Sequence, residues 1–190
     1  MADKLDLNAP KERKLFFSKQ VDQDSIEKIT KEIVEINDSD KLLKKQYKVY
    51  GFKYKAKPIK IYIDSYGGAV YQIMGLVGVM DKSKTPIYTY CTGAAMSCGF
   101  ILLICGHKRF CYKHGTPLYH QVSSWAGGKV EDIGQKHKEV KRLQTKLEEM
   151  TIRLTNISKT KLDKIRKEKI DWYMTADEAL KLGVVGKIIE

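Results

Sequence analysis

The residues best suited to chemistry lie in the run Cys91-Thr-Gly-Ala-Ala-Met-Ser-Cys-Gly99, between an apolar strand and an apolar helix. Ser97 is a lone hydroxyl at the helix end of this turn. The first backbone N–H groups of a helix are free, and its dipole favours developing negative charge. A serine raised on such a turn could attack a carbonyl and have the oxyanion stabilised nearby. The alternative is that Ser97 is only a helix N-cap.

A serine nucleophile needs a general base and a group that orients the base. His120 ends an apolar strand just before a polar loop, and Asp171 lies between a charged helix and the pair Trp172-Tyr173. Each residue also has an ordinary alternative: His120 could be a structural histidine, and Asp171 could be a helix cap or a turn residue. Spacing alone does not assemble a triad, because triads are recognised by geometry. The remaining histidines lie in charged or turn contexts that indicate surface positions: His107, His114 and His137.

The composition favours one domain with a real core, since the chain has 190 residues and is 43% hydrophobic. No apolar run approaches the roughly 18 residues needed to span a membrane. The first residues are polar and alternating, unlike a signal peptide, so we expect a cytoplasmic protein. The four cysteines show no CxxC spacing, so we expect buried thiols and no metal or disulfide framework.

The net charge of +12 raises nucleic-acid binding as a possible function. The excess is spread widely, however. Segment 41–60 holds eight lysines and no acid, whereas 129–169 mixes lysines with acids as a solvated helix face does. No aromatic-interleaved basic motif of a known nucleic-acid module is present. We therefore do not expect nucleic acid to be the main partner.

Strands and helices are expected to alternate, which predicts an α/β fold with a mainly parallel sheet. A first helix should begin at an Asp24 or Ser25 N-cap and end near Asn37, and Gly183 should stop the last one. A long amphipathic helix is expected over 129–156 and a short one over 161–168. Strands are expected at 14–18, 59–63, 85–91, 108–112, 117–122 and 184–189.

Two segments are harder to interpret. Residues 1–13 are expected to form a flexible arm. Segment 38–58 is rich in lysine and carries alternating apolar residues, so it could be a β-hairpin turning at Tyr50-Gly51-Phe52 or a mobile loop. The sequence does not decide between these two alternatives.

From about Lys11 to Ile189 the chain resembles the proteolytic subunit of the Clp protease. The resemblance is carried by dispersed motifs in the right order, and the serine, histidine and aspartate each fall inside their own motif. These motifs are Lys11-Glu-Arg-Lys-Leu-Phe-Phe17, Ile61-Tyr-Ile-Asp-Ser-Tyr-Gly-Gly68, the serine turn, Leu118-Tyr-His-Gln121 and Asp171-Trp-Tyr-Met-Thr-Ala-Asp-Glu-Ala179.

The resemblance implies a ClpP/crotonase-like fold of repeated βαβ units, with 129–156 as a projecting handle helix. It implies a serine endopeptidase in which Ser97 is the nucleophile, His120 the general base and acid, and Asp171 the residue that holds the imidazole. The backbone N–H groups of Gly68 and Cys98 would form the oxyanion hole. Segment 125–130 would pair with the substrate as an added strand and join two rings. The implied substrate-binding residues are Gly67, Gly127 and Gly128.

By the same resemblance, the partners would be an unfolded polypeptide substrate, an ATP-dependent AAA+ unfoldase and further copies of the chain. The copies would form a heptameric ring or double ring enclosing a chamber. No cofactor is expected, and no phosphate-loop motif is present.

The chain departs from the family pattern at several places. Tyr66 and Val122 replace prolines that could shape the substrate groove. Lys169-Ile170 replaces an acidic–basic pair that links the rings. Segment 38–57 is longer than its equivalent and would fall near the outer surface, where the family docks its ATPase through hydrophobic pockets. These departures keep open a catalytically silent or regulatory subunit of a mixed ring.

The crotonase enzymes, which use paired N–H groups to hold a thioester enolate, offer a further alternative. That chemistry does not need a Ser-His-Asp set, which argues against an acyl-CoA enzyme.

Overall fold

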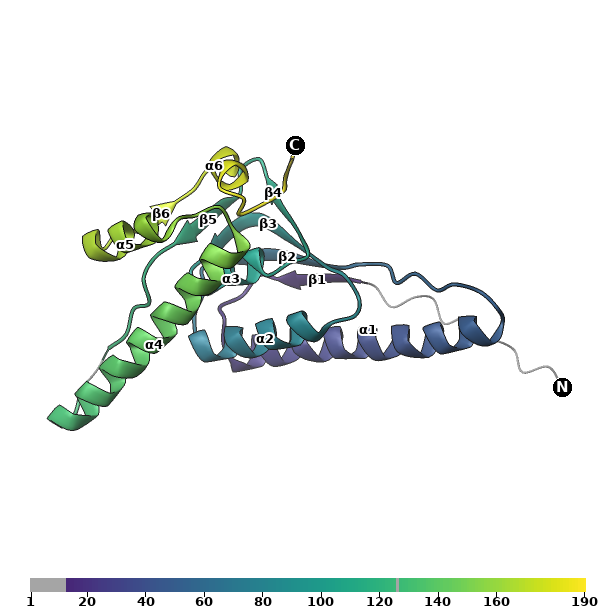
Figure 1. Cartoon of the computed structure of the whole chain (residues 1–190), viewed down its shortest axis with the longest axis horizontal. Helices are drawn as coiled ribbons and strands as arrows, with labels where there is room; N and C mark the ends of the chain where they lie inside the picture. The colour runs from purple at the N-terminus through teal and green to yellow at the C-terminus, as the bar shows by residue number, and fades with distance from the viewer. Residues whose placement is uncertain (1–12, 126) are drawn as a thin grey trace.

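The centre of the molecule is a twisted, mainly parallel β-sheet, seen in a computed structural model that describes residues 13–125 and 127–190 (Figure 1). Along the sheet lie β1 (Lys14–Phe17), β2 (Ile59–Ser65), β3 (Ile87–Met96), β4 (Lys108–Tyr112) and β7 (Lys187–Ile189). β5 (Thr116–Tyr119) pairs parallel with the far end of β3, and β6 (Trp172–Tyr173) pairs antiparallel with β5. The predicted α/β class is confirmed.

Helices connect these strands. They are α1 (Gln23–Val49), α2 (Val70–Lys82), α3 (Cys98–Ile104), α4 (Val130–Leu154), α5 (Lys159–Glu168) and α6 (Ala176–Lys181). α1 and α2 run side by side along one face of the sheet, and the N-terminal half of α4 projects away from the body (Figure 1). The predicted long helix over 129–156 is thus present with slightly shorter bounds. Within the described ranges, no helix combines the length and apolarity that crossing a membrane requires.

The core lies between the sheet and the helices that cover it. Alternate residues of β2, namely Ile59, Ile61 and Ile63, are fully buried, as expected for a strand with one face against a core. α1 contributes a stripe that includes Ile29 and Ile33. Each such side chain contributes roughly 1.5–3 kcal/mol by leaving water. This packing fixes the strand ends that carry the candidate site.

Segment 38–58 is neither the hairpin nor the loop that the sequence allowed. α1 continues to Val49, and the chain then turns at Gly51 and returns without regular structure. Residues 41–49 include no glycine or proline, so the helix has no local reason to stop. The rings of Tyr47 and Tyr54 meet edge to face with centroids 5.2 Å apart, which packs the returning segment against the helix.

Asp40 holds this extension to the body of the molecule. Its buried carboxylate accepts hydrogen bonds from the Arg13 guanidinium at 2.6 and 2.8 Å and from the Thr85 hydroxyl at 2.5 Å. The Tyr54 hydroxyl also donates to it. Arg13 in addition donates to the Lys57 carbonyl at 2.9 Å. One carboxylate therefore joins α1, the returning segment and the starts of β1 and β3.

The start of α1 also differs from the prediction, because the N-cap is Asp22. Its carboxylate accepts from the Ser25 N–H at 2.8 Å, and the Ser25 hydroxyl accepts from the Asp22 N–H at 3.1 Å. This reciprocal pair is a capping box. Ser25 therefore supports the cap from the third helical position. The predicted N-terminal arm lies outside the described residues except for Arg13.

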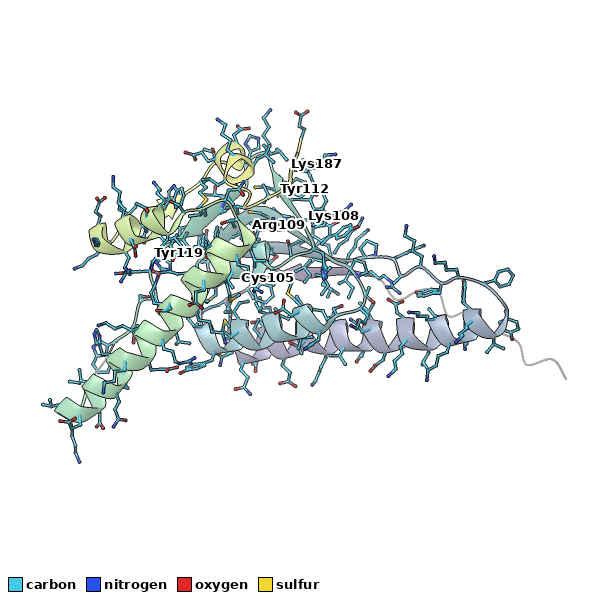
Figure 2. The ribbon with its side chains drawn as sticks, viewed as in Figure 1. Cys105, Lys108, Arg109, Tyr112, Tyr119 and Lys187 are labelled. Atoms are coloured by element: carbon cyan, nitrogen blue, oxygen red, sulfur yellow. The ribbon has the colours of Figure 1, made fainter. Side chains whose placement is uncertain are left out.

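Arg109 ties together the ends of two helices near the site. Its guanidinium donates to the carbonyls of Leu154 at the end of α4 and Ile104 at the end of α3, the latter at 3.4 Å (Figure 2). A cation at a helix C-terminus satisfies free carbonyls and complements the dipole. Arg109 thereby fixes the end of the projecting α4 to the helix that follows Ser97.

Candidate active site

Ser97 occupies a strained turn between β3 and α3. Its backbone has φ 54° and ψ −117°, a region that non-glycine residues rarely adopt. The Ser97 N–H donates to the Leu118 carbonyl of β5 at 3.0 Å, which holds the turn against the neighbouring strand. Ser97 stands at the N-cap position of α3, but its side chain makes no capping hydrogen bond. The hydroxyl is therefore not used by the helix.

His120 follows β5 directly, at the sheet edge where β3 also ends. β3 continues past its predicted end at Cys91 to Met96, and Met96 pairs with Leu118 of β5. β5 ends at Tyr119, earlier than the predicted Val122. Parallel strands present their carboxyl ends at one edge, where ligands commonly bind. Ser97 and His120 consequently line the same cavity.

Asp171 reaches this edge through β6. The antiparallel pairs Leu118–Tyr173 and Tyr119–Trp172 bring the residue before β6 opposite the residue after β5. The Nδ1 atom of His120 lies 3.4 Å from Oδ1 of Asp171, with 27% and 60% of the two side chains exposed. The structure thus brings together three residues that spacing alone could not connect.

Two glycines at the end of β2 complete the floor of the site. Gly67 and Gly68 have φ +98° and +147°. A Cβ on Gly67 would lie 2.7 Å from the Ser97 Cβ, and one on Gly68 would lie 2.3 Å from the Val21 carbonyl oxygen. Both the backbone conformation and the close approach therefore require glycine.

Two backbone N–H groups beside the cavity could stabilise a negative charge. Within residues 13–125 and 127–190, the N–H groups of Gly68 and Cys98 have no hydrogen-bond acceptor. The Cys98 thiol donates to the Gly68 carbonyl at 3.1 Å, which links the two peptide groups. Burial raises the pKa of this thiol to about 11, so it remains neutral near pH 7. The two free donors fit a developing oxyanion.

The other two predicted substrate residues lie apart from this cavity. Segment 123–125 has no regular structure, and Trp125 is 84% exposed with its ring against Gly127. Gly128 has φ +124° just before α4. In the part of the chain that the structure describes, the lining of the cavity reaches Ser123 but includes neither Gly127 nor Gly128.

Sequence reasoning missed several residues around the site. Gln144 of α4 lines the cavity, and its Oε1 accepts from the Val122 N–H at 2.7 Å. It was missed because a glutamine on an amphipathic helix resembles a solvated position. Val70, Ile101 and Leu147 supply apolar lining. Among the described residues, no three histidine, cysteine, aspartate or glutamate side chains are grouped to hold a metal ion.

The arrangement has the parts needed for acyl transfer. The Ser97 hydroxyl, which does not cap α3, and the His120 imidazole line the same cavity, and the Nδ1 atom of the imidazole faces the Asp171 carboxylate. Gly68 and Cys98, whose N–H groups have no acceptor among the described residues, line the same cavity, and donors of this kind can stabilise an oxyanion.

Comparison with known proteins identifies the family of the chain. The sequence model of the family described as "Clp protease" matches residues 4–190. The ATP-dependent Clp protease proteolytic subunit of Deinococcus radiodurans is 33% identical over 134 residues, which is 70% of this chain. The match spans 65% of that relative's own length. The chain therefore belongs to the Clp protease family.

Proposed function

We propose that this chain is the proteolytic subunit of an ATP-dependent protease, and that it cleaves unfolded polypeptides by serine acyl-enzyme chemistry. The observation that carries the proposal is the 3.4 Å approach of His120 to Asp171, with Ser97 lining the same cavity as His120 and its hydroxyl not capping α3. Family membership adds independent support.

The proposed mechanism follows from this arrangement. The Ser97 oxygen attacks the scissile carbonyl carbon while the His120 imidazole takes its proton. Asp171, facing Nδ1, holds the ring in the correct tautomer and stabilises its cation. The Gly68 and Cys98 N–H groups bind the oxyanion. His120 then gives the proton to the leaving amine, and a water molecule activated by the same base hydrolyses the acyl-enzyme.

The substrate would bind in extended form along the cavity edge. The unpaired segment 123–125 offers backbone groups for an added strand, and Val70, Ile101 and Leu147 offer an apolar surface for a side chain. The apolar lining favours an apolar residue at the position that precedes the cleaved bond.

A row of aromatic rings supports docking of an ATPase partner. Phe16, Tyr62, Tyr90 and Phe110 stack across β1 to β4, with successive centroids 5.1, 4.8 and 4.6 Å apart. Phe16 is 71% exposed at the end of the row. Exposed apolar surface of this kind marks interaction sites. An unfoldase loop bearing apolar residues would fit, and the relative's name couples its proteolysis to ATP.

A cleavage assay tests the proposal. The wild-type particle should hydrolyse a short fluorogenic peptide with an apolar residue before the cleaved bond, and Ser97→Ala of the same particle mass should not. Particle mass, measured by light scattering, should be that of a ring or double ring. A correctly assembled wild-type particle that cleaves neither peptide nor unfolded protein, with or without an ATPase partner, would contradict the proposal. That result would favour a catalytically silent subunit of a mixed ring.

A further inference from the structure

The side-chain amide of Gln144 contacts the residues on both sides of the His120–Gln121 pair, the backbone of Val122 and the hydroxyl of Tyr119. Its Oε1 accepts a hydrogen bond from the Val122 N–H at 2.7 Å. Its Nε2 lies 3.3 Å from the hydroxyl of Tyr119, the residue before His120. Tyr119 lies beside α4 (Figure 2), and its ring meets Phe100 of α3 edge to face with centroids 5.7 Å apart. A single amide on α4 therefore spans the segment that carries the imidazole.

The same amide is itself held in place. Its Nε2 donates to Oε1 of Glu148, one helical turn along α4, at 2.7 Å. The Glu148 carboxylate, 13% exposed, lies 3.3 Å from the Arg166 guanidinium of α5, and Arg166 also bonds Asp163. α5 leads to Asp171. The chain of contacts thus joins the elements that carry the imidazole and the carboxylate.

The segment after β5 needs such a contact. The pairing of β5 with β3 ends at Leu118 and that with β6 at Tyr119, so among the described residues no strand holds residues 120–122. Within the described ranges, the Val122 N–H donates only to Gln144. A partly buried donor left without a partner costs free energy and frees the backbone to move. Gln144 also lines the same cavity as Ser97 and His120, so movement of residues 120–122 would displace the imidazole from Ser97.

We propose that Gln144 is a positioning residue, which fixes the His120 segment so that the imidazole meets both Ser97 and Asp171. This inference rests on the proposed function, since it assigns Gln144 a part in the same reaction. Gln144 touches the backbone and Tyr119, and it acts on catalysis only through His120.

Kinetics of peptide cleavage test the role. Gln144→Leu replaces the amide with a slightly shorter apolar side chain of similar bulk and so removes its polar atoms. It should lower kcat roughly 10- to 100-fold, the effect of a small misplacement of a catalytic group, with KM changed less than about twofold. Gln144→Glu keeps an oxygen for the Val122 N–H but sets it against the Glu148 carboxylate. The double variant Gln144→Glu, Glu148→Gln, which exchanges the carboxylate and the amide, should therefore recover much of the loss. Gln135→Leu, an exposed glutamine on the same helix, is the matched control and should behave as wild type.

Deuterium uptake separates this inference from the proposed function. In Gln144→Leu, peptides covering residues 120–125 should exchange faster than in wild type, while peptides from β2 and β3 stay unchanged and the thermal midpoint moves little. Unchanged uptake over 120–125, or a kcat within about twofold of wild type, would overturn the role of Gln144. Absence of cleavage in wild type would instead contradict the proposed function, and the uptake measurement would still decide the inference.

Discussion

The Nδ1 atom of His120 and the Oδ1 atom of Asp171 lie 3.4 Å apart, although α4 and α5 separate the two residues in the chain. The contact arises from register. β6 pairs antiparallel with β5 through Leu118–Tyr173 and Tyr119–Trp172, and the next positions outward are these two residues. A two-residue strand thus delivers the carboxylate to the imidazole.

Asp171→Asn should leave the fold intact. It should no longer hold the His120 imidazole in the correct tautomer or stabilise the imidazolium that forms during catalysis. In serine triads this change lowers kcat by about 10⁴. Because Asp171 is 60% exposed, we expect a loss of at least about 100-fold in the rate of peptide cleavage. Asp177→Asn, an exposed aspartate in α6, is the matched control. A rate for Asp171→Asn within about threefold of that control would argue against the orienting role.

Gly68→Ala should damage both the fold and the oxyanion site. The new Cβ would lie 2.3 Å from the Val21 carbonyl oxygen at a φ of +147°. Overpacking of this kind lowers the free energy of unfolding by about 1–3 kcal/mol. Gly75→Ala on α2 is the matched control, since a Cβ there meets nothing within 4 Å. It should raise the free energy of unfolding by about 0.5–1 kcal/mol. Urea unfolding measures both, and equal effects would contradict the close approach.

Asp40→Ala should destabilise the protein, because it leaves the buried Arg13 guanidinium without its carboxylate. Removing one partner of a buried pair typically costs about 3–5 kcal/mol. Here the side chains of Arg13 and Asp40 are only 12% and 8% exposed. Asp38→Ala, an exposed aspartate on the same helix, should change little. The unfolding free energies of the two variants, compared in urea, check this.

The same carboxylate predicts a pH dependence. Burial raises the pKa of Asp40, but hydrogen bonds from Arg13, Thr85 and Tyr54 outweigh burial and lower it overall. Its stabilisation is therefore complete above the unfolded value, near 3.9, and is lost as pH falls through the lower folded value. Between about pH 5 and pH 3, the thermal midpoint of wild type should fall more steeply than that of Asp40→Ala. Parallel curves would show that this carboxylate does not contribute.

Cys98 should resist alkylation although it adjoins Ser97. Burial raises the pKa of its thiol to about 11, and the thiol donates to the Gly68 carbonyl. Only the thiolate reacts with iodoacetamide. At pH 8 the folded protein should therefore keep Cys98 unmodified, whereas the chain unfolded in urea should be alkylated there. Peptide mapping by mass spectrometry distinguishes the two. Equal modification of the folded and unfolded forms would contradict the buried thiol.

The alternation of strands and helices was predictable from the sequence, because hydrophobic periodicity is local. The path of segment 38–58 was not. Tyr50 and Phe52 suggested a strand period, but the helix continues to Val49. Residues 41–49 include no glycine or proline, and the contact of Asp40 with Arg13 anchors the helix to the body. The α1 cap was also misassigned, since Asp22 and Ser25 are both good caps and their reciprocal bonds decide the start.

At the site, the residue types indicated Ser97, His120 and Asp171 as candidates, and the resemblance to the Clp family assigned a role to each. Only the structure shows why these residues lie close together: β5 and β6 pair in a register that brings Asp171 to His120, and the Ser97 backbone adopts φ 54°. Gln144 carried no sequence signal, because its role depends on where α4 crosses the end of β5. Such contacts between distant elements cannot be derived from spacing.

Activation of Ser97 is tested most directly by labelling with a fluorophosphonate probe, followed by mass-spectrometric mapping of the modified residue. Wild type, Ser97→Ala and His120→Ala should be compared at equal particle mass. Wild type should carry a single modified residue, Ser97, and both variants should lose the labelling. A correctly assembled wild-type particle that is not labelled, or is labelled equally in His120→Ala, would contradict an activated Ser97.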